Sequence, residues 1–323
     1  MVQNDLGKGT VFQIGYLGSL GRELPNFLDV NLNPANTESL TYSVLPASGT
    51  TNYGPLGNTT LTVPVVYTSY GNQNLFGTNA TNFQSITELV SNINSNYNAM
   101  SIEVQNRSLR LIQFDANYTW AHSLDDSQNA STAGNTNNWY DPYQNPRINY
   151  GNSTWDIRDR FAAYAVISLP NLHTQSLLQY LTNDWKIDTS FQMQTGLPYS
   201  AAANTSTPGG AISSYINGSD GSSVIPGLGL NNYFESRDIV DDLRLQKDLK
   251  YKDRYTLQLI GQAFNLANHQ NETEVYGTAY NIGGTAAAPT LTYQSTWGTV
   301  EQTNNSGFSY TPREIELSMR LLF

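Results

Sequence analysis

The chain has 323 residues, a formal net charge of -10 at pH 7, and only 13% charged residues, about half the share usual in soluble domains. Such an acidic chain has no basic stripe with which to neutralise phosphates, which argues against nucleic-acid binding. No apolar run is long enough for a transmembrane helix, and the absence of cysteine excludes disulfides and thiolate metal sites.

Uncharged polar residues and tyrosine take the place of the missing charge. The chain holds 21 Tyr and 25 Gly, with many Asn, Thr, Ser and Gln, and its mean hydropathy is -0.42. This mixture suits a sheet with one face in lipid and the other in water, and it also suits long exposed loops.

Eight segments alternate apolar and polar residues with a period of two. Successive side chains of a strand point to opposite faces, so this period predicts antiparallel strands with one apolar and one polar face. In 155–169 the alternation is ambiguous, and in 185–197 it is clearest. The predicted strands cover 10–18, 97–106, 109–122, 155–169, 185–197, 239–249, 255–266 and 313–323.

Short and long connections alternate along this series. Successive turns of an antiparallel meander lie at opposite ends, so all short turns collect at one end and all long loops at the other, as in an outer-membrane β-barrel. The long connections are 19–96, 123–154, 198–238 and 267–312; the short or medium ones are 107–108, 171–184 and 250–253. We expect a helical turn in 171–184, a small hairpin at 61–67, and an extension of the last two strands at 290–297.

The last predicted strand resembles an outer-membrane assembly signal. Its apolar residues share one face, and the sequence ends on an aromatic residue, which would invite aggregation at a soluble sheet edge but suits a membrane interface. The predicted assembly signal comprises Ile315, Leu317, Met319, Leu321 and Phe323.

The same alternation predicts which side chains meet lipid and which meet the barrel lumen. We expect an outward apolar band roughly 25 Å tall, to which Leu317 and Met319 also contribute. The predicted lipid-facing residues are Ile112, Phe114, Phe191, Met193, Leu257 and Leu259. The predicted lumen-facing residues are Gln113, Asp115, Asp188, Gln192, Arg244, Gln258 and Arg320.

Several short stretches, taken in their order and spacing, resemble one known family. They are 10–19 with 21–25, 96–99, 116–126, 155–161, 194–199, 264–269 and 321–323. Together they are similar to the C-terminal half of the barrel of TonB-dependent outer-membrane receptors, and within these to the Oar-like group. The resemblance extends over nearly the whole chain.

The resemblance implies a fold, a location and partners. Such receptors have a barrel of about 22 strands closed by a plug, and a short N-terminal box contacts TonB. The sequence contains neither these parts nor a signal peptide, so we expect residues 1–323 to be the C-terminal portion of such a barrel. The implied location is the outer membrane, and the implied partners are its lipid, the barrel-assembly machinery, an unidentified solute, and TonB through the missing N-terminal part.

The fold expected is therefore all-β: an incomplete barrel of about eight long strands whose first strand lacks a partner. Two alternatives remain open. A self-contained eight-stranded barrel with a structural or adhesive role would pair 10–18 with 313–323. A secreted β-sandwich that binds carbohydrate would bury the apolar residues between two sheets.

No motif predicts catalysis, a cofactor or a metal. The sequence has no Gly-x-Ser-x-Gly, phosphate-binding loop or His-Glu-x-x-His, so we expect a protein that is not an enzyme. The charged segment 155–161 is interpreted as a strand start that links neighbouring strands rather than a ligand site. The pairs Asp125–Asp126 and Asp241–Asp242 lack the spaced oxygens of a calcium loop and are interpreted as solvated or lumen-facing carboxylates.

Overall fold

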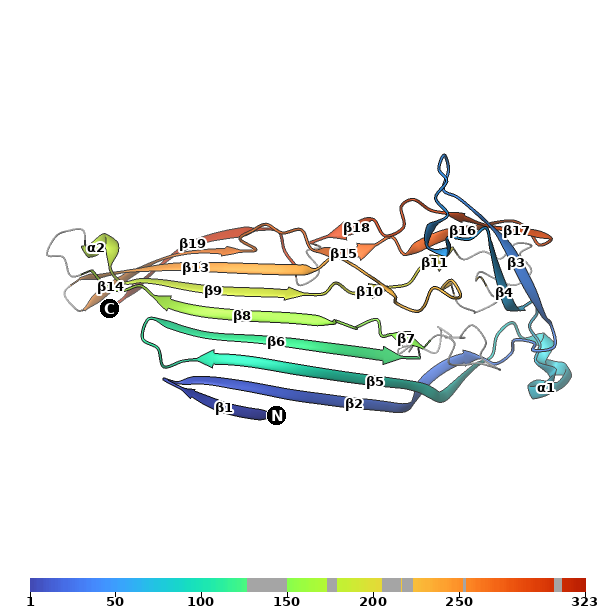
Figure 1. The fold of residues 1–323 in the computed structure, drawn as a ribbon, viewed down its shortest axis with the longest axis horizontal. Coiled ribbons are helices and arrows are strands. Elements are labelled where there is room, and N and C mark those ends of the chain that lie inside the picture. The colour runs from blue at the N-terminus through green and yellow to red at the C-terminus, as the bar shows by residue number, and fades with distance from the viewer. Residues whose placement is uncertain (127–149, 173–178, 205–215, 217–222, 252–253, 305–309) are drawn as a thin grey trace.

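A computed structural model describes residues 1–126, 150–172, 179–204, 216, 223–251, 254–304 and 310–323. Its main element is a 10-stranded antiparallel sheet, called here the long sheet, in which neighbours along the sheet follow one another along the chain (Figure 1). Among the described residues, no helix is long and apolar enough to cross a membrane.

The strands of the long sheet confirm the eight predicted segments. In sheet order they are β1 (Val2–Gly7), β2 (Thr10–Asp29), β5 (Thr87–Asn106), β6 (Ile112–Asp125), β8 (Asp159–Ser168), β9 (Trp185–Gln194), β13 (Asp238–Tyr251), β14 (Tyr255–Phe264) and β19 (Glu314–Leu322), with the short β7 (Gly151–Asn152) beside β6. β2 and β5 have 20 residues each, twice the ~10 that a membrane crossing needs, so they continue beyond the bilayer.

The prediction that strand 10–18 lacks a partner is wrong. β1 pairs with β2 from Val2↔Ile14 to Gly7↔Thr10. The hairpin turn places Gly7, Lys8 and Gly9 at positive φ, which glycine adopts without strain, and Asp5 accepts a hydrogen bond from the Gly7 amide at 2.8 Å. β1 has only six residues, and several of them are polar. Its sequence therefore shows too little alternation of apolar and polar residues to predict a strand.

All short turns lie at one end of the long sheet and all long connections at the other (Figure 1). We call these the turn end and the loop end. The turn end also holds the chain terminus after β19 and the short helix α2 (Gln179–Thr182), which lies in the predicted helical link 171–184. Residues 173–178 of this link lie outside the described residues.

The loop end folds into smaller sheets. A five-stranded sheet, called here the loop-end sheet, has the order β11 (Ala202–Ala203), β16 (Thr278–Thr285), β17 (Ala288–Tyr293), β3 (Thr37–Leu45) and β4 (Thr60–Tyr67). Two pairs accompany it: β10 (Pro198–Tyr199) with β12 (Tyr233–Phe234), and β15 (Glu272–Val275) with β18 (Val300–Thr303). The short helices here are η1 (Gly54–Leu56), α1 (Gln73–Phe76) and η2 (Gly77–Asn82).

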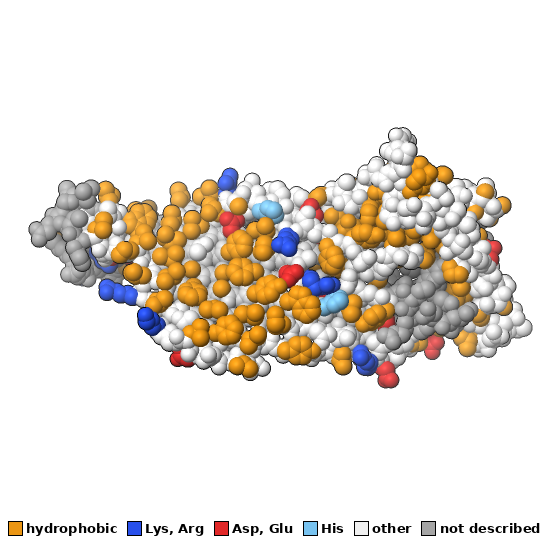
Figure 2. All heavy atoms as spheres, viewed as in Figure 1, with side chains coloured by type: hydrophobic (Ala, Val, Ile, Leu, Met, Phe, Trp, Pro, Cys, Tyr) orange, Lys and Arg blue, Asp and Glu red, His pale blue; other side chains and the backbone are white. Residues whose placement is uncertain are grey.

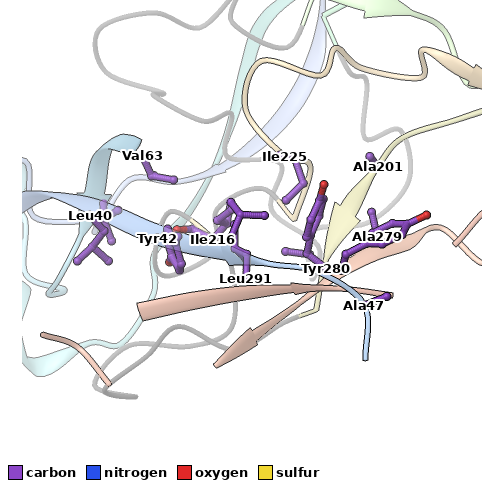
Figure 3. Packing of buried hydrophobic residues seen from close by; sticks show 14 residues of the cluster. Leu40, Tyr42, Ala47, Val63, Ala201, Ile216, Ile225, Ala279, Tyr280 and Leu291 are labelled. Carbon is purple, nitrogen blue, oxygen red and sulfur yellow. The ribbon is translucent and has the colours of Figure 1, made fainter. Parts of the chain in front are cut away.

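The hydrophobic core of the molecule lies in the loop-end sheet (Figure 3). Tyr42, Val63, Tyr280 and Leu291 are completely buried there. Residues 61–67, expected to form a small hairpin, instead lie in a single strand, β4, which pairs with β3. The expected extension of the last two strands at 290–297 is wrong, because β17 pairs with β16 and runs parallel to β3 instead. Parallel pairing between distant loops leaves no signal in local sequence.

Candidate functional site: the two faces of the long sheet

The ladders of the long sheet place all predicted lipid-facing side chains on one face. Residues directly opposite each other in an antiparallel ladder share a face. Phe114 is opposite Ala165, which is opposite Thr189; the same row continues through Leu243 and Ala263 to Ile315. Neighbouring rows of this face, called here the apolar face, contain Ile112, Phe191, Met193, Leu257, Leu259, Leu317 and Met319.

The predicted lumen-facing side chains occupy the opposite face, called here the polar face. Gln113 is opposite Val166, which is opposite Asp188, and Asp188 is opposite Arg244. Adjacent rows contain Asp115, Gln192, Gln258 and Arg320. The two predicted sets are therefore separated without a mismatch, since each strand keeps its alternation across the ladders.

No second sheet covers the apolar face in the described part of the chain. Leu317 is 84% exposed and Met319 is 76% exposed, and none of the predicted lipid-facing residues is buried. Figure 2 shows hydrophobic side chains crowded over the strands of the long sheet. A β-sandwich would bury this face between two sheets, so the sandwich alternative is wrong.

Hydrogen bonds and an ion pair join the side chains of the polar face, both along β13 and from β13 to its neighbours β9 and β14. Arg244 lies 3.8 Å from the carboxylate of Asp188 and donates to the Gln246 side-chain oxygen at 3.2 Å. Gln246 donates to Asp248 at 2.9 Å, and Gln258 donates to the same carboxylate at 3.2 Å. A concentration of charged and amide groups of this kind suits a face that lines water rather than hydrocarbon.

A shallow pocket of about 310 Å³ opens over this polar network. Tyr164 and Phe264 are both on the polar face and line the pocket together with Ser190 and Asp242, which are joined by a hydrogen bond of 3.1 Å. The ion pair between Arg244 and Asp188 lies along the same wall. Aromatic, carboxylate and guanidinium groups thus meet at one place where a polar solute could be held.

The charged segment 155–161 links strands, as predicted. The buried carboxylate of Asp156 accepts hydrogen bonds from the Ser123 amide at 2.7 Å and from Arg158 at 2.8 Å. Asp159 accepts a hydrogen bond from the hydroxyl of Tyr118 on the neighbouring strand. These contacts anchor the loop before β8 to the end of β6.

The two aspartate pairs cap loops. Asp126 accepts hydrogen bonds from the backbone and side chain of Asn94, at 3.0 and 2.9 Å. Asp241 accepts from the Ala267 amide at 3.1 Å, and Asp242 from the Asn265 amide at 3.0 Å. Nowhere in the described ranges do three His, Asp or Glu side chains converge so that they could hold a metal ion.

The sequence did not predict a group of acidic side chains at the base of the loop end. Burial, followed by the charge of Asp238, raises the pKa of Glu235 to about 7. Glu272 and Glu274 add further repulsion, and Glu272 also accepts hydrogen bonds from Ser236 at 2.7 and 2.8 Å. The two glutamates lie on β15, far from Glu235 along the chain, so only the folded loops bring these carboxylates together.

The long sheet is a meander with one mainly apolar face and one polar face, and it has short turns at one end and long loops at the other. This combination defines an outer-membrane β-barrel protein. The family described as "Outer membrane beta barrel domain" matches residues 1–241. The chain belongs to this family, and its location is the outer membrane. No curated protein sequence matches it significantly.

Proposed function

We propose that this chain forms the C-terminal portion of the barrel of a TonB-dependent receptor that takes up a solute across the outer membrane. The observation that carries the proposal is the separation of a mainly apolar face from a polar face along the long strands, with hydrogen bonds and an ion pair that join the polar side chains on β9, β13 and β14. The apolar face then meets lipid, and the polar face lines the path of the solute.

The edges of the long sheet support the assignment to a larger barrel. β1 and β19 stand at opposite ends of the strand order, and in the described part of the chain no ladder joins them (Figure 1). Unpaired backbone groups cost several kcal/mol each in hydrocarbon. We therefore infer that further strands, which the resemblance assigns to an earlier part of the same barrel, complete the wall in the membrane.

The remaining parts of the proposal rest on the resemblance. Energy for uptake would come from TonB through an N-terminal plug and box. The polar pocket around Tyr164, Asp188 and Arg244 would contact the solute, and the protein would have no catalytic role.

Uptake can be tested without knowing the solute. A strain that lacks the gene and the same strain carrying it are grown in one medium, and the solutes removed from the medium are compared by mass spectrometry. We expect at least one solute to be depleted only when the gene is present, and its depletion to stop when a protonophore removes the energy source of TonB. Identical depletion in both strains would contradict uptake and favour the structural or adhesive alternative.

The orientation of the faces can be tested separately, because the chain has no cysteine of its own. Single substitutions Phe191→Cys and Gln192→Cys place a thiol on neighbouring residues of opposite faces. A membrane-impermeant maleimide should label the second thiol in intact outer membranes and leave the first unlabelled. Equal labelling of both thiols would contradict a lipid-covered apolar face.

A further inference from the structure

We propose that the apolar face carries a binding site for one anionic phospholipid at the turn end, in a groove between α2 and the strands β13, β14 and β19. The proposal rests on the orientation proposed above, in which this face meets lipid. It is independent of which solute the receptor takes up.

The groove has a volume of about 510 Å³ and is lined almost entirely by hydrocarbon. The groove is deepest at Gly261. This glycine lies between Leu245 and Leu317 on the neighbouring strands and has no side chain to fill the space between them. A Cβ built at Gly261 would meet only Leu317, at 3.4 Å, so the furrow is open space above the backbone. The remaining apolar walls are formed by Tyr180, Leu181, Trp185, Leu249 and Leu259.

One wall of the groove is fixed in place before any lipid arrives. The indole N–H of Trp185 donates to the Leu181 carbonyl at 2.7 Å and holds α2 against the sheet. The Asp248 amide donates to the Asp184 carbonyl at 3.1 Å, which ties the link after α2 to β13. A preformed groove loses little conformational freedom when a chain enters it.

Among the described residues that line this groove, Lys247 is the only charged one. Lys247 is on the apolar face, opposite Trp185 on one side and Leu259 on the other. Its ammonium group is 5.8 Å from the centre of the Trp185 ring and donates to the Asn183 carbonyl. In the described ladders, the other charged residues of this face, Asp159 and Asp241, lie toward the loop end.

The charge of Lys247 selects the headgroup. An ammonium has three donors, and the contact with Asn183 uses one of them. The carboxylate of Asp184 is held by Lys250 at 2.7 Å, and this hydrogen bond is the main cause of its lowered pKa, to which the charge of Lys247 adds a smaller share. Lys247 is only 5% exposed, but it lines the groove, so a phosphate diester would reach its ammonium from inside the groove while the acyl chain lies in the furrow over Gly261. A zwitterionic headgroup would bring its own ammonium and bind less well.

The test measures lipid adducts on the protein purified from outer membranes in detergent, by native mass spectrometry. Phosphatidylglycerol and phosphatidylethanolamine with the same acyl chains are added in turn. We expect phosphatidylglycerol to bind about fivefold more tightly, the factor that one lysine contributes near an anionic lipid. Equal binding of the two lipids to the unmodified protein would overturn the proposal.

Three variants test separately how the headgroup contact, the shape of the groove and the overall charge of the protein contribute to lipid binding. Lys247→Gln should reduce phosphatidylglycerol binding to the level of phosphatidylethanolamine, whereas Gly261→Leu should weaken both lipids by filling the furrow. Lys186→Gln removes the same charge from the polar face and should change the binding of neither lipid.

Two outcomes would contradict the site. If Lys247→Gln weakens both lipids equally, Lys247 only holds α2 in place; if Gly261→Leu has no effect, no acyl chain lies in the furrow. Failure of the uptake proposal would instead appear in the gene-deletion strain and would leave the ratio of the two lipid affinities unchanged.

Discussion

The long sheet and the loop-end sheet bury their hydrophobic residues in different ways. In the loop-end sheet, β3 presents Leu40, Tyr42 and Val44 inward, and these side chains pack against residues from two other loops. In the long sheet the corresponding residues stay exposed, as Leu317 does. Both sheets thus alternate apolar and polar residues. The apolar residues of the loop-end sheet pack in a protein core, whereas those of the long sheet face lipid.

The two regions also differ in how their polar groups are satisfied. The buried hydroxyls of the loop-end sheet bond to backbone: Tyr42 donates to the Ile216 carbonyl at 3.1 Å, and Tyr280 to the Tyr53 carbonyl at 2.8 Å. Burial raises the pKa of both tyrosines to about 12. On the long sheet the polar side chains bond mainly to one another along the polar face. The loop-end sheet is therefore organised as a small water-soluble domain, and the long sheet as a membrane wall.

The largest expected effect concerns assembly of the membrane wall. Changing Phe323→Asp removes the terminal aromatic of the predicted assembly signal and should abolish most of the folded protein in the outer membrane. Heat-modifiable gel migration measures the folded fraction. Phe234→Ala, in the loop-end strand β12, is the control and should assemble normally. Equal yields of the two variants would show that assembly does not depend on the last residue.

A core substitution should distinguish the two regions most directly. Leu291→Ala, at a completely buried position of β17, should lower the stability of the loop-end sheet by about 2–5 kcal/mol, because it leaves a cavity. Leu257→Ala on the apolar face should lower the stability of the long sheet much less, since lipid chains fill the space left by the side chain. Thermal unfolding followed by protease resistance measures both. Similar losses would mean that both sheets are packed by protein.

Charge placed on neighbouring residues of one strand should sharpen the contrast between the faces. Phe191→Arg puts a guanidinium on the apolar face toward the middle of β9 and should destabilise the protein by about 2–4 kcal/mol in bilayers. Gln192→Arg places the same group on the polar face and should have little effect. Urea unfolding in lipid vesicles compares the two. A larger cost for the second variant would reverse the assignment of the faces.

The smallest expected effect is a pH dependence confined to the loop end. Burial raises the pKa of Glu235 from 4.5 to about 7, so the folded state holds its proton more tightly than the unfolded state does. The β10–β12 and β15–β18 pairs should therefore be most stable at low pH and lose stability as the pH rises from 4.5 to 7.

Glu235→Gln should remove this loss of stability between pH 4.5 and 7. Hydrogen exchange at pH 8 should then be slower in the loop-end strands of the variant than in those of the unmodified protein. The β13–β14 ladder of the long sheet is the internal control and should exchange at the same rate in both proteins. Faster exchange at the loop end of the variant would contradict the raised pKa.

The local sequence determined the long sheet almost completely. Alternation in segments such as 185–197 and 255–266 predicted the strands, their meander order, and the side of each residue, because a strand keeps its period and consecutive strands pair through short turns. The predicted lipid-facing and lumen-facing residues separate onto two faces for this reason. β1 was missed, since it is short and polar and becomes a strand only by pairing with β2.

Only the tertiary structure decided how the loops fold and what the turn end can bind. The parallel contacts of β11 with β16 and of β17 with β3 join segments that are distant along the chain, so no local pattern predicts them. The clustering of Glu235 with Glu272, and the groove beside Lys247, likewise depend on which elements meet in space. Periodicity specifies the faces of a strand, but the loop-end contacts and the phospholipid groove arise from packing between elements that the sequence keeps far apart.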